Sequence, residues 1–286
     1  MADNKRVSGY GLGSVDTVMS VDAVEQAARE LGGGGPSRDD LKALLGEREI
    51  AVDLNGLKAG YGRMEILHGL DMLVGKGQSL CLIGPNGAGK STVLHAIFGF
   101  SDVLGGSITV GDRDVTRLTS NEKLSAAGVA YILQDNSVFP DMTVEENLLM
   151  GGFLKNRPAE ARQAADRVFE KYARLAERRK QKAGTLSGGE RRLLEISRAL
   201  IMDPQVLLVD EPSIGLEPRF IDMVFEILGD LQQGDGKTII MVEQNAKKGL
   251  EFADIGYVLV SGQLAKAGLG NDLLNDDDVG RLFLGG

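Results

Sequence analysis

The sequence predicts an α/β protein that has a mostly parallel sheet and helices on both faces of that sheet. From about residue 49 onward, short apolar runs alternate with stretches in which apolar residues recur every three or four positions. Such runs are typical of buried parallel strands, and such stretches are typical of helices that cover a sheet. A glycine-rich segment also separates one apolar run from a helical stretch, as in phosphate-binding loops. This alternation is what a sheet covered on both faces requires.

The composition excludes several classes of protein. The chain has 286 residues, a net charge of −9 and a single cysteine, Cys81. The acidic balance argues against a general affinity for nucleic acid, and one cysteine excludes an internal disulfide framework. No apolar run approaches the roughly 18 residues of a membrane-spanning helix, and the N-terminus lacks the apolar core of a signal peptide. We therefore expect a cytoplasmic protein that reaches a membrane only through partners and binds no nucleic acid.

Residues 1–48 differ from the rest of the chain and predict an extension of two short helices. Apolar residues from Val15 to Leu31 recur with the spacing of one helix face. Gly32–Gly35 predict a hinge, and Ser37 predicts the N-cap of a second helix that stops at Gly46. Both a loosely attached extension and one that packs against the core or a partner fit this pattern, because short helices are marginal alone.

The remaining residues, 49–286, predict one domain with an inserted helical subdomain at about 136–186. Two strands near the start and a later hairpin predict a small antiparallel region beside the parallel sheet. The expected strands cover residues 50–57, 64–74, 79–84, 106–115 (the hairpin), 129–134, 205–210, 238–242 and 255–260. The expected helices cover residues 90–98, almost all of 143–182, 188–202, 219–231 and 279–284, with a short helix before the last strand.

The strongest motif is a phosphate-binding loop, GPNGAGKST, which stands between an expected strand and an expected helix. Glycines leave successive backbone N–H groups free to surround a polyphosphate, and a helix N-terminus attracts its negative charge. Lys90 can neutralise the β- and γ-phosphates, and Ser91 can bind Mg²⁺. The residues that we expect to hold the nucleotide here are Gly84, Pro85, Asn86, Gly87, Ala88, Gly89, Lys90, Ser91 and Thr92.

Two carboxylates, Asp210 and Glu211, stand at the end of the apolar run QVLLV. Ligands of open α/β sheets bind at the carboxyl ends of the strands. We therefore expect Asp210 to hold Mg²⁺ and Glu211 to orient and deprotonate an attacking water. A helix N-cap is the alternative, because Pro212 follows, but the presence of a phosphate-binding loop favours the catalytic interpretation.

A third motif, LSGGE, opens the long helix that precedes Asp210. Ser187, Gly188 and Gly189 offer hydroxyl and backbone donors at a helix N-terminus, which would suit a second phosphate. In this order, the phosphate-binding loop, LSGGE and QVLLVDEP resemble the ATP-binding subunits of ABC transporters, and the resemblance covers residues 49–286. It implies that two ATPase chains sandwich ATP, so that Ser187, Gly188 and Gly189 contact the nucleotide held by the opposite subunit.

The same resemblance implies roles for three further residues and one loop. Tyr61 matches the aromatic residue that stacks on adenine, and Gln134 matches the glutamine that touches Mg²⁺ and links the core to the helical subdomain. Residues 214–217 match the loop that crosses the dimer interface. Gln244 occupies the switch position, where the family usually has a histidine that contacts the γ-phosphate. Glutamine can hydrogen-bond a phosphate, but it is a poor proton relay.

Further segments, among them DEPSIGLEP, MVEQNAKKGLEFADIGYVL and the terminal LFLGG, resemble the branched-chain amino acid uptake group of this family. The resemblance implies an ATP-hydrolysing motor subunit of an importer for branched-chain or related amino acids and amides. ATP would close the dimer and hydrolysis would reopen it. The implied partners are a second ATPase subunit, two membrane permease chains and, indirectly, a substrate-binding protein at the cytoplasmic face of the inner membrane.

Three alternatives stay open. The first is a soluble ABC ATPase that drives no transport, although such proteins commonly carry two cassettes or a long coiled-coil insertion. The second is an ATPase of the lipopolysaccharide-export type, although that group keeps the histidine that Gln244 replaces. The third is a regulatory subunit that hydrolyses ATP weakly, which the same glutamine would suit. We expect His68, His95 and Cys81 to serve in packing, because no His/Cys cluster has metal-ligand spacing.

Overall fold

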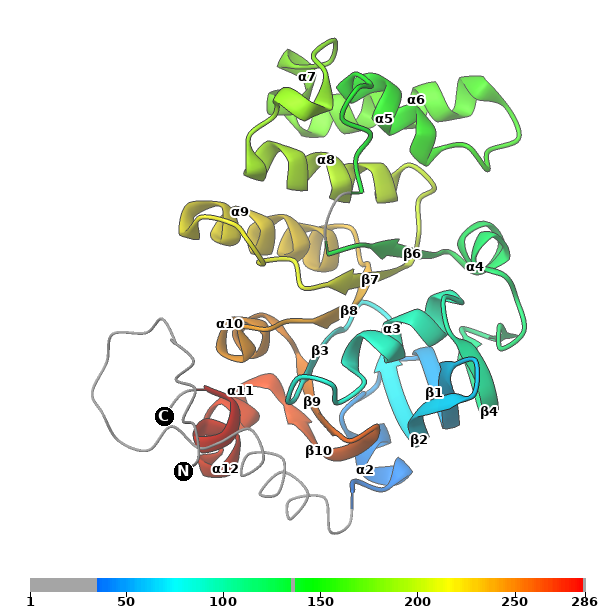
Figure 1. Cartoon of the computed structure of the whole chain (residues 1–286), viewed down its shortest axis with the longest axis vertical. Coiled ribbons are helices and arrows are strands. Elements are labelled where there is room, and N and C mark those ends of the chain that lie inside the picture. The colour runs from blue at the N-terminus through cyan, green and yellow to red at the C-terminus, as the bar shows by residue number, and fades with distance from the viewer. Residues whose placement is uncertain (1–34, 135–136, 285–286) are drawn as a thin grey trace, which may run out of the picture.

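The computed structural model describes residues 35–134 and 137–284. Within them, two sheets and the surrounding helices form the arrangement in Figure 1, in which α5–α8 lie at one end and the antiparallel strands at the other. The first helix expected in the extension, from Val15 to Leu31, lies outside the described residues. In the described part of the chain, no helix is both long enough and apolar enough to cross a membrane.

The central sheet has six strands in the order β10-β9-β3-β8-β7-β6. The strands are β10 (Gln263–Leu269), β9 (Ile255–Val260), β3 (Ser79–Ile83), β8 (Thr238–Val242), β7 (Val206–Asp210) and β6 (Val129–Ile132). All neighbouring pairs are parallel except β9 and β10. This arrangement confirms the mostly parallel sheet, and β10 is an antiparallel edge strand that the apolar pattern did not reveal. Its mixed exposure hides the signal of a buried strand.

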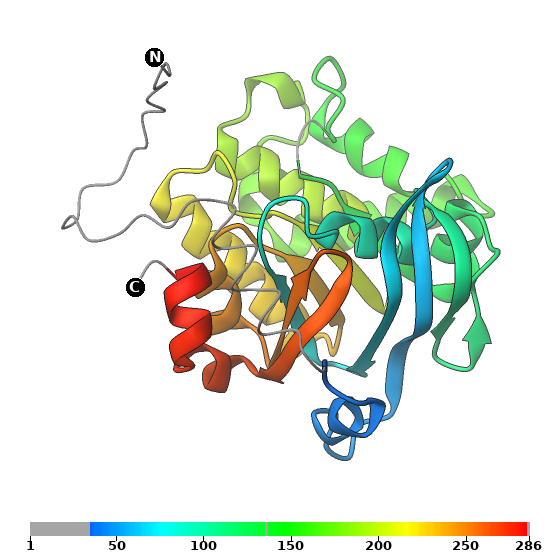
Figure 2. The ribbon, with the colours of Figure 1, turned by 60° about the horizontal axis from the view of Figure 1, so that its bottom comes forward.

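A second, antiparallel sheet has the order β2-β1-β4-β5 and confirms the small antiparallel region. Its strands are β1 (Ile50–Tyr61), β2 (Met64–Gly75), β4 (Asp102–Val110) and β5 (Arg113–Asp114). Figure 2 shows the long β1–β2 hairpin running past the central sheet, on the side opposite to α11 and α12. Tyr61 is the last residue of β1 and stands beside the turn of this hairpin.

The helices follow the expected pattern with two differences. They are α2 (Arg38–Ala43), α3 (Lys90–Phe98), α4 (Ser120–Ala127), α5 (Val144–Gly151), α6 (Pro158–Lys171), α7 (Ala173–Glu177), α8 (Gly188–Leu200), α9 (Pro218–Gly229), α10 (Ala246–Phe252), α11 (Gly270–Leu274) and α12 (Asp277–Val279). Neither α4 nor α11 was expected. Residues 143–182, expected to be almost all helical, form three helices, because Gly152 ends α5 and Pro158, which lacks an N–H group, starts α6.

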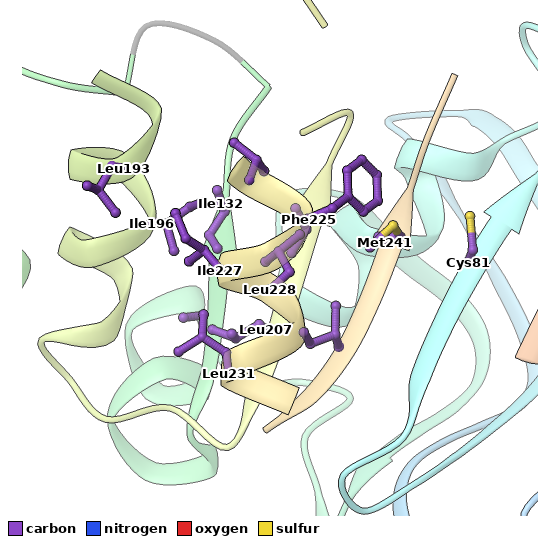
Figure 3. Close-up of a cluster of buried hydrophobic side chains, with 14 of the residues drawn as sticks. Cys81, Ile132, Leu193, Ile196, Leu207, Phe225, Ile227, Leu228, Leu231 and Met241 are labelled. Atoms are coloured by element: carbon purple, nitrogen blue, oxygen red, sulfur yellow. The ribbon is translucent and has the colours of Figure 1, made fainter. Parts of the chain in front are cut away.

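The core lies on both faces of the central sheet because alternate residues of a strand point to opposite sides. On β7, Leu207 packs with Ile196 of α8 and Leu228 of α9, and Figure 3 shows this cluster. The next residue, Leu208, packs in a second cluster with Ile97 of α3 and the antiparallel sheet. All five side chains are fully buried, and burial of such a side chain contributes about 1.5–3 kcal/mol. The two clusters fix α3 and α8 on opposite faces.

The second part of the extension packs against the antiparallel sheet. Ser37 caps α2 as expected, in a capping box in which Asp40 bonds back to the Ser37 backbone. Leu41 is fully buried among side chains of β1 and β2. Arg38 forms ion pairs with Asp53 at 2.8 Å and with Asp71 at 3.0 Å. One apolar side chain and one doubly paired arginine therefore attach α2 to the sheet.

Candidate nucleotide site

The phosphate-binding loop joins β3 to α3, and two of its glycines are required by the backbone. Gly84 has φ +147°, and a Cβ there would lie 2.1 Å from the Leu259 carbonyl oxygen. Gly89 caps α3 with φ +99°. Lys90 folds back over the loop, and its Nζ donates to the carbonyls of Gly84 at 2.9 Å and Pro85 at 3.0 Å. The lysine therefore lies above the cradle that a phosphate would enter.

Asp210 lies at the carboxyl end of β7, against the first turn of α3. It is buried, and its Oδ1 accepts a hydrogen bond from Ser91 Oγ at 3.2 Å. Its other oxygen, Oδ2, accepts a bond of 2.7 Å from the hydroxyl of Tyr131 on β6. Burial raises the pKa of Tyr131, and the Asp210 charge adds to that effect. Tyr131 therefore remains protonated, donates to Asp210 and holds the carboxylate beside Ser91.

Glu211 follows Asp210 in a left-handed backbone conformation, with φ +43°. Its N–H donates to the Val242 carbonyl of β8 at 2.8 Å, and its Oε2 accepts from Gln134 Nε2 at 2.8 Å. A non-glycine residue in this conformation is strained, and such strain is concentrated at functional sites. Burial raises the pKa of Glu211, the charges of Asp210 and Glu243 raise it further, and Lys90 opposes them. A carboxylate of raised pKa is a stronger general base.

One pocket gathers most of the residues predicted to hold the nucleotide. Its lining consists of Tyr61, Ile66, Asn86, Gly87, Gly89, Lys90, Ser91, Thr92 and Glu211. Tyr61 comes from β1, Lys90 and Ser91 come from α3, and Glu211 follows β7. The pocket therefore combines an aromatic ring, a phosphate-binding loop and a carboxylate at the strand ends, which is the combination expected of a nucleotide site.

Ser187, Gly188 and Gly189 do not line this pocket. Ser187 caps α8, and in Figure 1 that helix lies in the upper part of the molecule while α3 lies below the middle. A Cβ on Gly189 would meet the Phe220 ring at 2.1 Å, so glycine is needed where α8 starts beside α9. The N-terminus of α8 is thus separated from the loop of its own chain. Within one chain, these three residues and the phosphate-binding loop do not form a single site.

Glu190 serves the helix cap. Its Oε2 accepts bonds from the backbone N–H and the hydroxyl of Ser187, both at 3.0 Å, and its Oε1 accepts from Arg178 Nε at 2.5 Å. Burial raises the pKa of Glu190, but the bonds from Ser187 and Arg178 outweigh it and leave the pKa below the usual value. Arg178 and Ser187 therefore compensate the charge of Glu190 at the start of α8.

The segment after β8 contains one residue that the sequence reasoning missed. Gln244 is exposed and lies outside the pocket lining, whereas Glu243 beside it is buried. Glu243 accepts bonds from Ser213 Oγ at 2.6 Å, Ser213 N at 3.3 Å and Asn245 N at 3.0 Å. It thereby joins the switch position to the loop that follows Glu211. A carboxylate at the carboxyl end of a buried strand was the available signal, as for Asp210.

The oxygen donors of this site fit Mg²⁺ when a nucleotide supplies the remaining ligands. Ser91 Oγ and Asp210 Oδ1 lie 3.2 Å apart, and both are hard oxygen donors. The amide of Gln134, the third predicted ligand, contacts Glu211 instead of this pair. Among residues 35–134 and 137–284, no group of three His, Cys, Asp or Glu side chains could hold a metal alone. Mg²⁺ typically binds through one or two protein oxygens and substrate phosphates.

Comparison with known proteins identifies the family. The model of the ABC transporter family matches residues 67–214. The chain is 41% identical over 226 residues to the high-affinity branched-chain amino acid transport ATP-binding protein BraG of Pseudomonas aeruginosa, covering 79% of this chain and 96% of that protein. It is 37% identical over 229 residues to the probable branched-chain amino acid transport ATP-binding protein LivF of Archaeoglobus fulgidus, covering 80% and 96%.

A solved structure gives the same result for the fold. The ADP conformation of MJ1267, an ATP-binding cassette of an ABC transporter, matches with a TM-score of 0.73 and 28% identity, covering 83% of this chain and 99% of that one. The family match, the two relatives and the cassette structure agree with the order of the motifs and with the pocket that they form. The chain therefore belongs to the ABC transporter family and is an ATP-binding cassette ATPase.

Proposed function

We propose that this chain is the ATP-hydrolysing motor subunit of an importer for branched-chain amino acids or for related amino acids and amides. The observation that carries the proposal is the position of Glu211. This residue has a strained backbone, lines the same pocket as the phosphate-binding loop and follows Asp210, which contacts Ser91. The substrate class rests on the two relatives, whose names state branched-chain amino acid transport. The exposed Gln244 at the switch position also favours this group over lipopolysaccharide-export ATPases.

The loop from Gly84 to Thr92 binds the phosphates of ATP, and Tyr61 stacks on adenine. Glu211 accepts a proton from a water whose oxygen attacks the γ-phosphorus, while the bond from that phosphorus to the β,γ-bridging oxygen breaks. ADP and inorganic phosphate are the products. Lys90 and the backbone N–H groups of the loop stabilise the charge that develops on the phosphate oxygens. Mg²⁺, held by Ser91 and Asp210 with Gln134 nearby, would neutralise part of the phosphate charge.

A second ATPase chain, identical or homologous, completes the site. Its Ser187, Gly188 and Gly189 contact the γ-phosphate from the side opposite to the loop, because the N-terminus of α8 attracts negative charge. ATP thus draws two chains together, and loss of the γ-phosphate releases them. Gln244 hydrogen-bonds the γ-phosphate or the attacking water without carrying a proton. Residues 214–217 cross the interface between the chains.

A groove beside α5 supports a membrane-protein partner. The exposed apolar side chains Phe139, Met150 and Phe153 line it together with Arg198 of α8. Exposed apolar groups gathered around a groove mark interaction sites. We assign the groove to a cytoplasmic segment of a permease chain, so that the subunit is held at the cytoplasmic face of the inner membrane. Two permease chains and a substrate-binding protein complete the importer.

The division of the chain follows the same proposal. Residues 1–48 form an extension to an ATPase domain of residues 49–286, and the helical subdomain covers about 136–186. The placement of α5, α6 and α7 inside that range supports the subdomain. The buried Leu41 and the paired Arg38 support an extension whose second helix packs on the ATPase domain.

Replacement of Glu211 by glutamine tests the proposed reaction. The amide cannot take the proton of water, so we expect ATP hydrolysis by the assembled transporter to fall roughly 10²- to 10⁴-fold with ATP affinity unchanged. Glu226→Gln, at an exposed position of α9, is the matched control. Hydrolysis by Glu211→Gln at the rate of the control would contradict the assignment of the base.

Three measurements separate the proposal from its alternatives. Cells that lack this chain should lose uptake of labelled leucine, isoleucine or valine, and the unaltered gene should restore it. Recovery of permease chains with the purified protein supports transport, whereas a soluble partner set alone would support a non-transport ATPase. Multiple turnovers by the purified chain alone would count against a purely regulatory, weakly hydrolysing subunit.

A further inference from the structure

We propose that His95 is a positioning residue for nucleotide binding, which holds the ring of Tyr61 at the edge of the nucleotide pocket. The main evidence is a hydrogen bond of 2.5 Å between the Tyr61 hydroxyl and His95 Nδ1. The inference rests on the proposed function, in which Tyr61 stacks on adenine. It adds a residue that the sequence assigned to packing alone.

The contact with His95 acts on a side chain that is partly exposed. It ends β1 and is 43% exposed, with one side facing the pocket. The His95 ring meets it edge-on, with ring centroids 6.1 Å apart and an interplanar angle of 82°. A half-exposed tyrosine that is free to change rotamer must lose that freedom when a base stacks on it. The bond to His95 restricts the ring before the ligand arrives.

The helix that carries His95 also begins at the phosphate-binding loop. Ser91 and His95 are four residues apart on α3 and therefore lie on the same helix face. The first of them faces Asp210, and the second faces Tyr61. Consequently, α3 sets the distance between the phosphate cradle and the ring proposed to hold the base.

His95 is itself held by an aromatic cluster. Its ring lies 5.8 Å from the ring of Phe100 and 5.8 Å from that of Tyr131, whose hydroxyl donates to Asp210. Burial lowers the pKa of His95, and the charge of Asp210 acts in the opposite direction. The imidazole is therefore neutral at neutral pH, and with its proton on Nε2 it accepts the Tyr61 hydroxyl at Nδ1.

The test compares two ligands by isothermal titration calorimetry in the presence of Mg²⁺. ATP uses the base contact, whereas inorganic tripolyphosphate uses only the phosphate-binding loop. For His95→Leu we expect about three- to tenfold weaker binding of ATP, because one hydrogen bond is lost. Binding of tripolyphosphate should be unchanged. His95→Asn keeps a polar atom near the place of Nδ1 and should restore most of the ATP affinity. His68→Leu, the same change at the other, partly exposed histidine, should bind both ligands normally.

A double-mutant cycle isolates the contact. Tyr61→Phe removes the hydroxyl but keeps the ring, so it should weaken ATP binding as much as His95→Leu does. The double variant should then lose no more than either single one, because both remove the same bond. Additive losses would show that the two residues act separately and would overturn the inference.

The remaining outcomes distinguish this inference from the proposed function. An equal loss of ATP and tripolyphosphate binding in His95→Leu would place the effect on the fold of α3 and refute a role through Tyr61. Unchanged ATP binding in His95→Leu, with a loss in Tyr61→Ala, would refute the role of His95 and leave Tyr61 in place. Unchanged ATP binding in Tyr61→Ala would refute the stacking role, and with it this inference. Failure of the unaltered protein to bind either ligand would refute the nucleotide site.

Discussion

Replacement of Lys123 by methionine should change how the stability of the protein depends on pH. Lys123 lies on α4 and is only 1% exposed, and its Nζ donates to the Ala96 carbonyl near the end of α3 at 3.0 Å. No ion pair to Lys123 occurs within the described parts of the chain. Burial lowers its pKa from 10.5 to about 8. Because each pKa unit corresponds to about 1.4 kcal/mol, the buried charge costs roughly 3 kcal/mol at neutral pH.

The sign of the pH dependence follows from the two pKa values. Below about pH 8 the folded and unfolded chains both carry the proton, and the full cost is present. Between about 8 and 10.5 the folded protein has released the proton while the unfolded chain keeps it, so rising pH favours folding. Above 10.5 both states are neutral and the cost has gone. The free energy of unfolding should therefore rise by about 3 kcal/mol across this range in the unaltered protein, and not in Lys123→Met.

The pH dependence is a sharper measure than stability at one pH. At neutral pH, methionine removes the buried charge but leaves the Ala96 carbonyl without its donor, which costs about 1–3 kcal/mol, so the two effects nearly cancel. We would measure urea unfolding by far-ultraviolet circular dichroism near neutral pH and near the upper limit of this range. Lys247→Met, an exposed lysine on α10, is the control. If the stability difference between Lys123→Met and the unaltered protein were the same at both pH values, the reasoning would be refuted.

Two further substitutions test the packing of α2 and the electrostatics of the site. Leu41→Ala should lower the free energy of unfolding by roughly 2–5 kcal/mol, because Leu41 is fully buried. Leu44→Ala, at a partly buried position, should lower it by less. An unchanged urea midpoint in Leu41→Ala would show that α2 is not coupled to the fold. Glu243→Gln removes a charge that raises the pKa of Glu211 but can still accept the Ser213 hydroxyl. Its profile of hydrolysis rate against pH should extend to lower pH, since the base loses its proton earlier, and coincident profiles would contradict this.

Features that depend on a short segment could be predicted from the sequence better than contacts between residues far apart in the chain. The phosphate-binding loop, the parallel strands and the carboxylates at the end of β7 could be predicted because each depends on a short segment. A loop that binds phosphate through its backbone needs glycine, and a buried strand needs an apolar run. The interruption of the helix between α5 and α6 also depends on a short segment, which contains Gly152 and Pro158. The strong helical pattern on both sides concealed this signal.

The roles of single side chains depended on packing. Glu190 ends the LSGGE motif, and the structure shows that it caps α8 and pairs with Arg178. His95 was expected to serve in packing, and Lys123 lies on α4, a helix that was not expected. Their contacts with Tyr61 and Ala96 join positions 34 and 27 residues apart.

The sequence by itself determined where a nucleotide's phosphates would bind and which carboxylates would stand beside them. These features follow from the chemistry of contiguous residues, and any chain that formed the strand, loop and helix would present them. Only the tertiary structure decided which side chains support them, for example that Tyr131 holds Asp210 and that Glu243 holds Ser213. The physical reason is that such hydrogen bonds need atoms within about 3 Å, and periodicity does not specify how separate elements pack to that precision.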